Sequence, residues 1–189
     1  GDGTFVNVSK QTGIAGVEFP MYGVTAMDWN SDGWPDILTS AYCRSGGSLW
    51  KNNKDGTFTD VASTVGYTSQ FAKGNVEYDQ NGNQIVRDLC QWAVVPADFD
   101  NDGDIDLLQA LVHGGVDFGE GHSTITVNQG AAKGYKLKWD MSRLQRKNPQ
   151  SSALGDMDAA WFDLDNDGWQ DCAYGELVYD PGKDRLFMF

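Results

Sequence analysis

The sequence is poor in basic residues. It contains 14 Lys and Arg against 27 Asp and Glu in 189 residues, so its formal net charge is −13. Nucleic acids and anionic membrane surfaces attract proteins through Lys/Arg patches, which this chain lacks. Its 40% hydrophobic content nevertheless argues against disorder. We therefore expect a folded acidic protein that binds no nucleic acid.

Long apolar runs are also missing. No stretch of 18 apolar residues occurs, so no segment is expected to insert into a membrane. The first residues show no signal peptide, and the chain opens inside a repeat unit described below. We therefore expect a mature product or a piece of a longer chain.

Cysteines are few and follow no redox or metal pattern. Cys43, Cys90 and Cys172 form neither CxxC nor CxxCH, which excludes a zinc ribbon, a thioredoxin-type site and a c-type haem. Three cysteines permit one internal disulfide at most, and Cys43 with Cys90 is the pair we would expect. The alternative is three small buried apolar side chains.

Histidine is almost absent, and no catalytic motif occurs. His113 and His122 both lie in a glycine-rich segment that also contains Asp117 and Glu120. This segment can be interpreted as a second metal site or an acid–base pair, but a glycine-rich surface loop is favoured. There is no G-x-S-x-G elbow, P-loop or H-E-x-x-H. We predict no catalytic residue and no enzymatic activity.

Glycine and aromatic residues are plentiful. There are 23 Gly against 5 Pro, and Phe, Trp and Tyr make up 12% of the chain. This balance suits many short strands joined by tight turns, so an all-β fold is predicted.

The acidic residues gather in three windows. Residues 28–36, 98–106 and 163–171 hold three, five and four of them, nearly half of the total of 27. All three windows fit D-x-[DN]-x-D-G-x-x-D. Clustered carboxylates repel one another, and bound cations neutralise them.

The spacing within these windows suits calcium. Ca²⁺ takes six to eight oxygen ligands, and short acidic or amide side chains at positions 1, 3 and 5 can converge on it where glycine at position 6 permits a sharp turn. Position 7 should contribute a backbone carbonyl and position 9 a closing carboxylate. We predict about three Ca²⁺ ions, one per window. The predicted ligands are Asp28, Asn30, Asp32, Trp34 and Asp36; Asp98, Asp100, Asp102, Asp104 and Asp106; and Asp163, Asp165, Asp167, Trp169 and Asp171.

Two alternatives to this interpretation are weaker. An EF-hand needs a bidentate Glu at position 12, where this chain has Thr39, Gln109 and Tyr174. A solvated acidic turn would be reasonable for one window, but not for three copies in phase. Magnesium demands a tighter octahedron, and softer metals prefer His or Cys.

The same strand-like segments surround each window. Apolar segments 24–27, 92–97 and 159–162 precede the windows, and segments 48–52, 124–128 and 185–189 form a later strand. A further segment, 54–61, is repeated at 1–8 and, in degenerate form, at 133–139. Four short strands per unit describe a blade of a β-propeller.

These units divide the chain as follows. We predict a partial β-propeller over 1–189: the end strand of a preceding blade plus connector (1–23), a blade (24–66), a connector with an extra hairpin around Asn81-Gly82 (67–91), a blade (92–140), a polar connector (141–158) and an incomplete blade (159–189). Three blades leave strand edges open. Further blades in a longer chain are favoured over the association of several copies.

The repeat pattern resembles the FG-GAP/VCBS family, whose blades include those of integrin α-subunits and cartilage acidic protein. The matching features are the three acidic windows, the segment 49–53, and the segment 55–61 followed by Gly66. The resemblance implies a seven- or eight-bladed propeller in an extracellular, cell-surface or periplasmic location. The integrin-type Phe-Gly and Gly-Ala-Pro signatures are absent, so integrin-like ligand recognition does not carry over.

Two functions remain open at this point. One is a non-enzymatic adhesion, protein-interaction or scaffold module with a protein or carbohydrate partner. The other is the propeller portion of a secreted carbohydrate-active enzyme of the polysaccharide lyase or hydrolase type. Trp34 and Trp169 can serve as partner contacts, although packing against a neighbouring blade is favoured.

Overall fold

The computed structural model describes residues 2–14, 21–41, 47–67, 76–78, 84–86, 90–112, 123–140, 142–144, 153–178 and 186–188. These residues are almost entirely β. The helical segments among them are single turns: α1 (Ser9–Thr12), α2 (Ala62–Val65) and the 3₁₀ turn η2 (Ala131–Lys133). The all-β prediction is confirmed.

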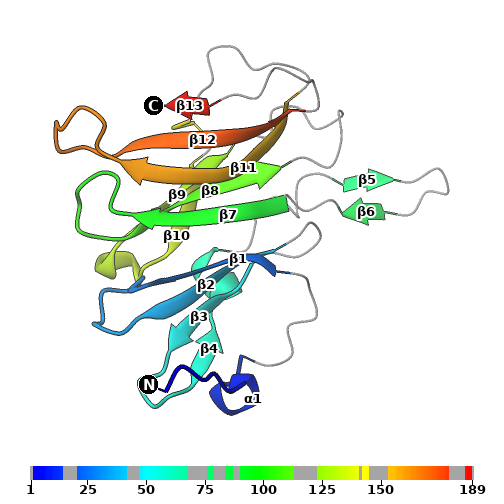
Figure 1. Ribbon diagram of the computed structural model, residues 1–189, viewed down its shortest axis with the longest axis vertical. Helices are drawn as coiled ribbons and strands as arrows, with labels where there is room; N and C mark the ends of the chain where they lie inside the picture. Colours follow the sequence, from blue (N-terminus) through cyan, green and yellow to red (C-terminus); the bar gives the residue numbers. More distant parts are fainter. Residues whose placement is uncertain are drawn as a thin grey trace.

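The first blade is a four-stranded antiparallel sheet. Its strands are β1 (Met21–Met27), β2 (Asp36–Ala41), β3 (Leu49–Asn52) and β4 (Phe58–Asp60), and they lie side by side in chain order (Figure 1). Each strand is therefore hydrogen-bonded to the one that precedes it, as in a propeller blade.

The second and third blades follow the same order. The second consists of β7 (Cys90–Ala97), β8 (Asp106–Val112), β9 (Thr124–Asn128) and β10 (Leu137–Asp140). The third has β11 (Ala153–Phe162), β12 (Asp171–Val178) and β13 (Leu186–Met188) among its described residues. A single pairing of Gly155 with Val112 joins the two sheets. Three consecutive blades are thus present, and the described strands do not close into a ring (Figure 1).

Three strands begin earlier than the sequence indicated, and one of them, β7, starts at Cys90 inside the predicted connector 67–91. β11 starts at Ala153, inside the segment predicted to be a polar connector, because it pairs with β12 as far as Ala153–Val178 across two register shifts. β1 starts at Met21 rather than Val24 because a bulge lets Met21 reach Ala41. The start of each strand is therefore set by how far the neighbouring strand extends to pair with it.

The predicted extra hairpin between the first two blades is present as a pair of short strands. β5 (Val76–Tyr78) pairs antiparallel with β6 (Gln84–Val86). Its Asn81-Gly82 turn lies outside the described residues.

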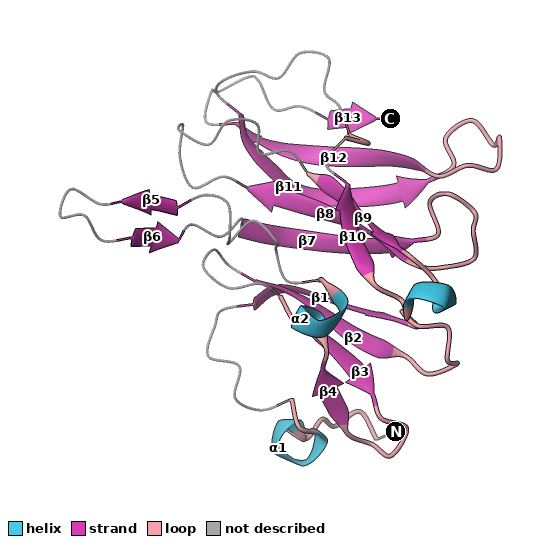
Figure 2. Ribbon diagram, turned by 180° about the vertical axis from the view of Figure 1, so that it is seen from behind, coloured by secondary structure: helices cyan, strands magenta, loops and turns pink. Residues whose placement is uncertain are grey.

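The hydrophobic core lies between blades. One buried cluster joins blade 1 to blade 2 and contains Leu38, Leu49, Tyr67 and Leu107. A second joins blade 2 to blade 3 and contains Leu108, Ile125, Cys172 and Tyr174. In Figure 2, α2 lies where blade 1 meets blade 2, and its residues Ala62 and Val65 belong to the first cluster.

Tryptophan indoles tie neighbouring blades together. Nε1 of Trp29 donates to the carbonyl of Tyr135, Nε1 of Trp139 to that of Gly66, and Nε1 of Trp161 to that of Val95, all at 3.1 Å. Each bond crosses from one blade to the next. Hydrogen bonds therefore hold adjacent blades together in addition to the burial of apolar side chains.

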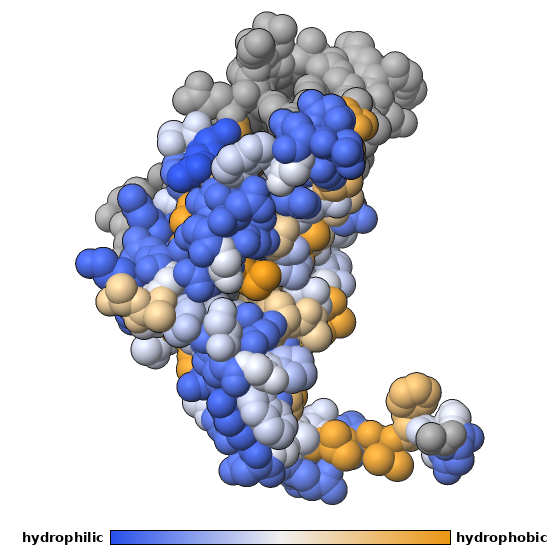
Figure 3. All heavy atoms as spheres, turned by 90° about the vertical axis from the view of Figure 1, so that its left-hand side faces the viewer, coloured by the Kyte–Doolittle hydropathy of each residue, from blue (hydrophilic) through white to orange (hydrophobic). Residues whose placement is uncertain are grey.

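The N-terminal segment repeats the turn that precedes β4 but has no strand partner in the described chain. Oδ1 of Asp2 accepts from the N–H and hydroxyl of Thr4, as Asp55 does from Thr57. However, β4 pairs with β3, whereas Phe5 is 99% exposed. The segment projects as an apolar arm in Figure 3.

Candidate metal centres

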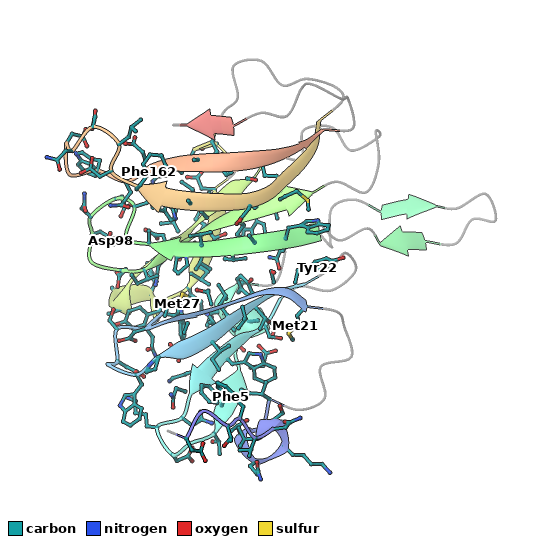
Figure 4. The ribbon with its side chains drawn as sticks, viewed as in Figure 1. Phe5, Met21, Tyr22, Met27, Asp98 and Phe162 are labelled. Atoms are coloured by element: carbon teal, nitrogen blue, oxygen red, sulfur yellow. The ribbon has the colours of Figure 1, made fainter. Side chains whose placement is uncertain are left out.

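The three acidic windows form equivalent hairpin loops at one end of the blades. We call residues 28–36 loop 1, residues 98–106 loop 2 and residues 163–171 loop 3. They connect β1 to β2, β7 to β8 and β11 to β12. Figure 4 labels Met27, Asp98 and Phe162 at the starts of these loops, and all three lie at the same side of the stacked sheets.

The loops share one backbone fold. In each, the position-1 Asp accepts the N–H groups of positions 5 and 6, as Asp98 does from Asp102 and Gly103 at 3.0 Å. The backbone is left-handed at positions 4 and 6, with φ of 57° at Asn101 and 92° at Gly103. Glycine at position 6 was expected. The left-handed position 4 was not, although Asn is one of the residue types that tolerate it.

Loop 2 brings four carboxylates together. Oxygens of Asp98, Asp100, Asp102 and Asp106 all lie within 4.8 Å of one another. Asp106 is fully buried, and Asp98 and Asp100 are half-buried. Such a group of oxygens can hold a metal ion.

Two oxygens in this cluster lack hydrogen bonds. Asp106 Oδ1 accepts the N–H of Asn128 at 2.7 Å, but its buried Oδ2 and Oδ1 of Asp100 have no hydrogen-bond partner of normal geometry. Burial raises the pKa of Asp106 to about 7, and the N–H groups of Asn128 and Phe99 only partly offset this effect. Burial also raises the pKa of Asp100, with a contribution from the Asp102 charge. A cation would supply the missing positive charge.

Loop 3 assembles part of the predicted set. Oxygens of Asp163, Asp165 and Asp171 lie within 4.8 Å of one another. Asp167 lies outside this group, and its Oδ1 accepts the N–H of Trp169 at 2.8 Å. Loops 2 and 3 also touch, since Nδ2 of Asn101 donates to the carbonyl of Gly168 at 3.2 Å.

Loop 1 is arranged differently. It carries Asn30 at position 3, and its three carboxylates do not form a cluster of the kind found in loops 2 and 3. Asp32 Oδ2 accepts from Nδ2 of Asn30 and lies 3.3 Å from Nζ of Lys54. Asp36 is fully buried, which raises its pKa, although the N–H groups of Asn52 and Trp29 partly compensate.

An asparagine on the third strand supports the position-9 Asp. The N–H of Asn52 donates to Asp36 Oδ1 at 2.8 Å, as that of Asn128 does to Asp106. Sequence reasoning missed this role, although the recurrence of Asn at the ends of two equivalent strands was a usable signal. No corresponding residue is described in blade 3.

The tryptophans at position 7 of loops 1 and 3 are exposed. Trp34 is 45% exposed and Trp169 54% exposed, and Leu164 in loop 3 is also exposed. Among the described residues, neither tryptophan is buried against a neighbouring blade, and the expectation that they pack there stays a prediction. That their backbone carbonyls, and that of Asp104, serve as ligands stays a prediction.

Other predicted residues contribute little to this region. Cys172 is buried and free, and burial raises the pKa of its thiol. Cys90 is in β7, and Cys43, His113 and His122 lie outside the described residues. The Cys43–Cys90 disulfide stays untested.

The comparison with known families agrees with this geometry. Residues 28–109, which include loops 1 and 2, match a family model described as an FG-GAP-like repeat. Residues 28–109 thus carry an FG-GAP-like repeat, which agrees with the propeller-type blades of the fold. No curated protein matches the chain. Within the described residues, no helix is long and apolar enough to cross a membrane.

Proposed function

We propose that this chain is the calcium-stabilised part of an extracellular β-propeller that serves as a non-enzymatic adhesion, protein-interaction or scaffold module. The FG-GAP-like repeat and the stacked blades support the propeller. The acidic loops support the calcium.

The observation that carries the calcium proposal is the carboxylate cluster of loop 2. Four acidic side chains within 4.8 Å repel one another, and one of them, Asp106, is fully buried with an oxygen that has no hydrogen-bond partner of normal geometry. Leaving such a group charged and unpaired is costly, whereas a divalent cation offsets the charge of two carboxylates.

The donor chemistry fits a hard cation. All ligands that loop 2 offers are oxygens, from Asp98, Asp100, Asp102 and Asp106. Calcium accepts irregular sets of carboxylate oxygens more readily than magnesium, which keeps its waters. When bound, Ca²⁺ supplies charge neutralisation and cross-links the start of the loop to β8. The loop residues themselves orient the carboxylates through the N–H bonds at positions 5 and 6.

The same end of the molecule offers a contact surface. Trp34, Leu164 and Trp169 are exposed on loops 1 and 3. Aromatic side chains of this kind are enriched at protein interfaces. We place partner contacts at this end. No observation on the described residues favours the carbohydrate-active enzyme.

The test is thermal unfolding with the metal controlled. The purified chain is desalted and melted in EGTA, with added Ca²⁺, and with the same concentration of Mg²⁺. At a free Ca²⁺ concentration of about 100 Kd, each site adds about 2.7 kcal/mol. That corresponds to about 5–10 °C in Tm for a chain of this length. Equal midpoints in EGTA and Ca²⁺ would overturn the calcium proposal.

A further inference from the structure

Lys54 crosses from the β3–β4 turn onto loop 1. Its Nζ lies 3.3 Å from Oδ2 of Asp32 and donates to the backbone carbonyl of the same residue at 3.4 Å. Asp32 occupies position 5 of the loop, where a cation ligand is predicted. A positive charge of the protein therefore stands beside one of the ligands.

Blade 2 has glycine at the equivalent place. The N–H of Lys54 donates to Oδ1 of Asn52, and the N–H of Gly130 donates to Oδ1 of Asn128. Both residues have a positive φ, of 68° and 67°. A Cβ built on Gly130 would lie 2.5 Å from Oδ2 of Asp104. Blade 2 thus has no side chain there, and among the described residues no ion pair joins this turn to loop 2.

Loop 1 keeps an acceptor suited to a cation. Asn30 is only 8% exposed, and its Oδ1 has no hydrogen-bond partner. Its Nδ2 group donates to Asp32 Oδ2, the same oxygen that Lys54 approaches. The loop therefore combines an unsatisfied ligand atom with an ammonium that contacts a predicted ligand. The cation near loop 2, Arg143, instead pairs with Asp140 and lies over the Phe99 ring.

We propose that Lys54 competes with the metal ion at loop 1 and lowers the affinity of this loop for the ion. This inference rests on the proposed calcium binding. An ion held by Asp32 and the Lys54 ammonium repel each other, so the ammonium must withdraw before the ion is fully bound. The Lys54 side chain is 45% exposed, so water can solvate the released ammonium at modest cost.

The size of the effect follows from that exposure. Because solvent screens the pair, removal of the Lys54 charge should tighten loop 1 by about fivefold rather than by orders of magnitude. The difference should shrink at high salt, because the Debye length falls to about 3 Å at 1 M.

The experiment is calcium titration by calorimetry on the whole chain. Lys54→Met removes the charge and keeps the length of the side chain, and Lys54→Arg keeps the charge. Asp32→Asn, alone and combined with Lys54→Met, identifies the heat that belongs to loop 1. We expect one site to tighten about fivefold in Lys54→Met, no such change in Lys54→Arg, and no change from Lys54→Met when Asp32→Asn is present.

The possible failures are distinguishable. If the wild-type chain and Lys54→Met bind three ions with the same affinities, the Lys54 inference is overturned and calcium binding stands. If the tightening persists in the Asp32→Asn background, the effect of Lys54 does not act through loop 1. If neither chain binds Ca²⁺, both proposals fall.

Discussion

The backbone N–H of Asn128 donates to Oδ1 of Asp106 at 2.7 Å, although the two residues are 22 positions apart. Asn52 and Asp36 repeat this bond at 2.8 Å in blade 1. The last acid of loop 1 and that of loop 2 are therefore each held by the third strand of their own blade. In blades 1 and 2, this acid therefore connects the loop, the second strand and the third strand.

Asn128 also fastens blade 2 to blade 1. Its Nδ2 donates to the carbonyls of Trp29 and Ile105, at 3.0 and 3.2 Å, and the residue is 1% exposed. Asn128→Ala leaves these buried acceptors unpaired and should lower the free energy of unfolding by about 2–3 kcal/mol. Urea unfolding of the variant and of the wild type measures this loss in the free energy of unfolding.

The matched control for this prediction is Asn52→Ala. Nδ2 of Asn52 donates only to the carbonyl of Pro35, and that bond is exposed. We expect a loss of about 1 kcal/mol or less. Equal losses for the two variants would show that the contact with Trp29 contributes nothing.

Asp106→Asn should abolish the increase in stability that calcium binding at loop 2 provides. The amide keeps the size of the carboxyl and removes its buried charge, so the metal-free variant should melt no lower than the metal-free wild type. The increment from Ca²⁺ should fall by about 2.7 kcal/mol, the contribution of one site at 100 Kd. Melts in EGTA and in Ca²⁺, at one pH, give both quantities.

Asp104→Asn serves as the comparison. Asp104 is outside the four-carboxylate cluster of loop 2, and its predicted ligand is a backbone carbonyl. Its Ca²⁺ increment should remain close to that of the wild type. A loss as large as that of Asp106→Asn would mean that the Asp104 carboxylate binds the ion itself.

Much of the fold was accessible from the sequence because the repeats are short and local. The left-handed glycine, the acids at fixed spacing and the strands on either side lie within one hairpin, so pattern alone located loops 2 and 3 and the blades around them. Boundaries were less accessible. β11 extends back to Ala153 because β12 is long enough to pair with it, and the propensities of residues 153–158 did not reveal this.

The differences between the three loops could not be predicted from the sequence, because they depend on contacts between residues that are far apart in the chain. All three match one pattern, yet Lys54 reaches Asp32 from 22 residues away and Asn128 reaches Asp106 across the blade. These contacts depend on which turns and strands become neighbours in space. The sequence motif contains the predicted ligands, but it does not include residues such as Lys54 and Asn128 that contact these ligands from other turns and strands.

Gly103→Ala should destabilise loop 2 through the backbone alone. Gly103 has φ of 92°, and nothing lies within 4 Å of a Cβ built there, so steric contact with neighbours adds no cost. The left-handed conformation costs an L-residue about 1–2 kcal/mol. Urea unfolding in EGTA separates this cost from any effect on metal binding.

Gly175→Ala is the control for that substitution. A Cβ on Gly175 also meets nothing within 4 Å, and this strand residue does not have the left-handed φ of Gly103. Alanine there should be neutral or stabilise by about 0.4–1 kcal/mol by reducing the freedom of the unfolded chain. If both variants lose stability equally, backbone strain at Gly103 is not the cause.

Phe5 and Phe58 test whether equal sequence gives equal structure. Both follow Asp-Gly-Thr, but Phe58 begins β4 opposite Asn52, whereas Phe5 is 99% exposed. Phe58→Asp should cost about 1–3 kcal/mol, and Phe5→Asp should stay within about 0.5 kcal/mol of the wild type, because only the first disturbs a packed strand. Urea unfolding of both variants at one protein concentration decides it. A comparable loss for Phe5→Asp would mean that the N-terminal segment is packed in solution, since an exposed, unpaired segment has no contact to lose.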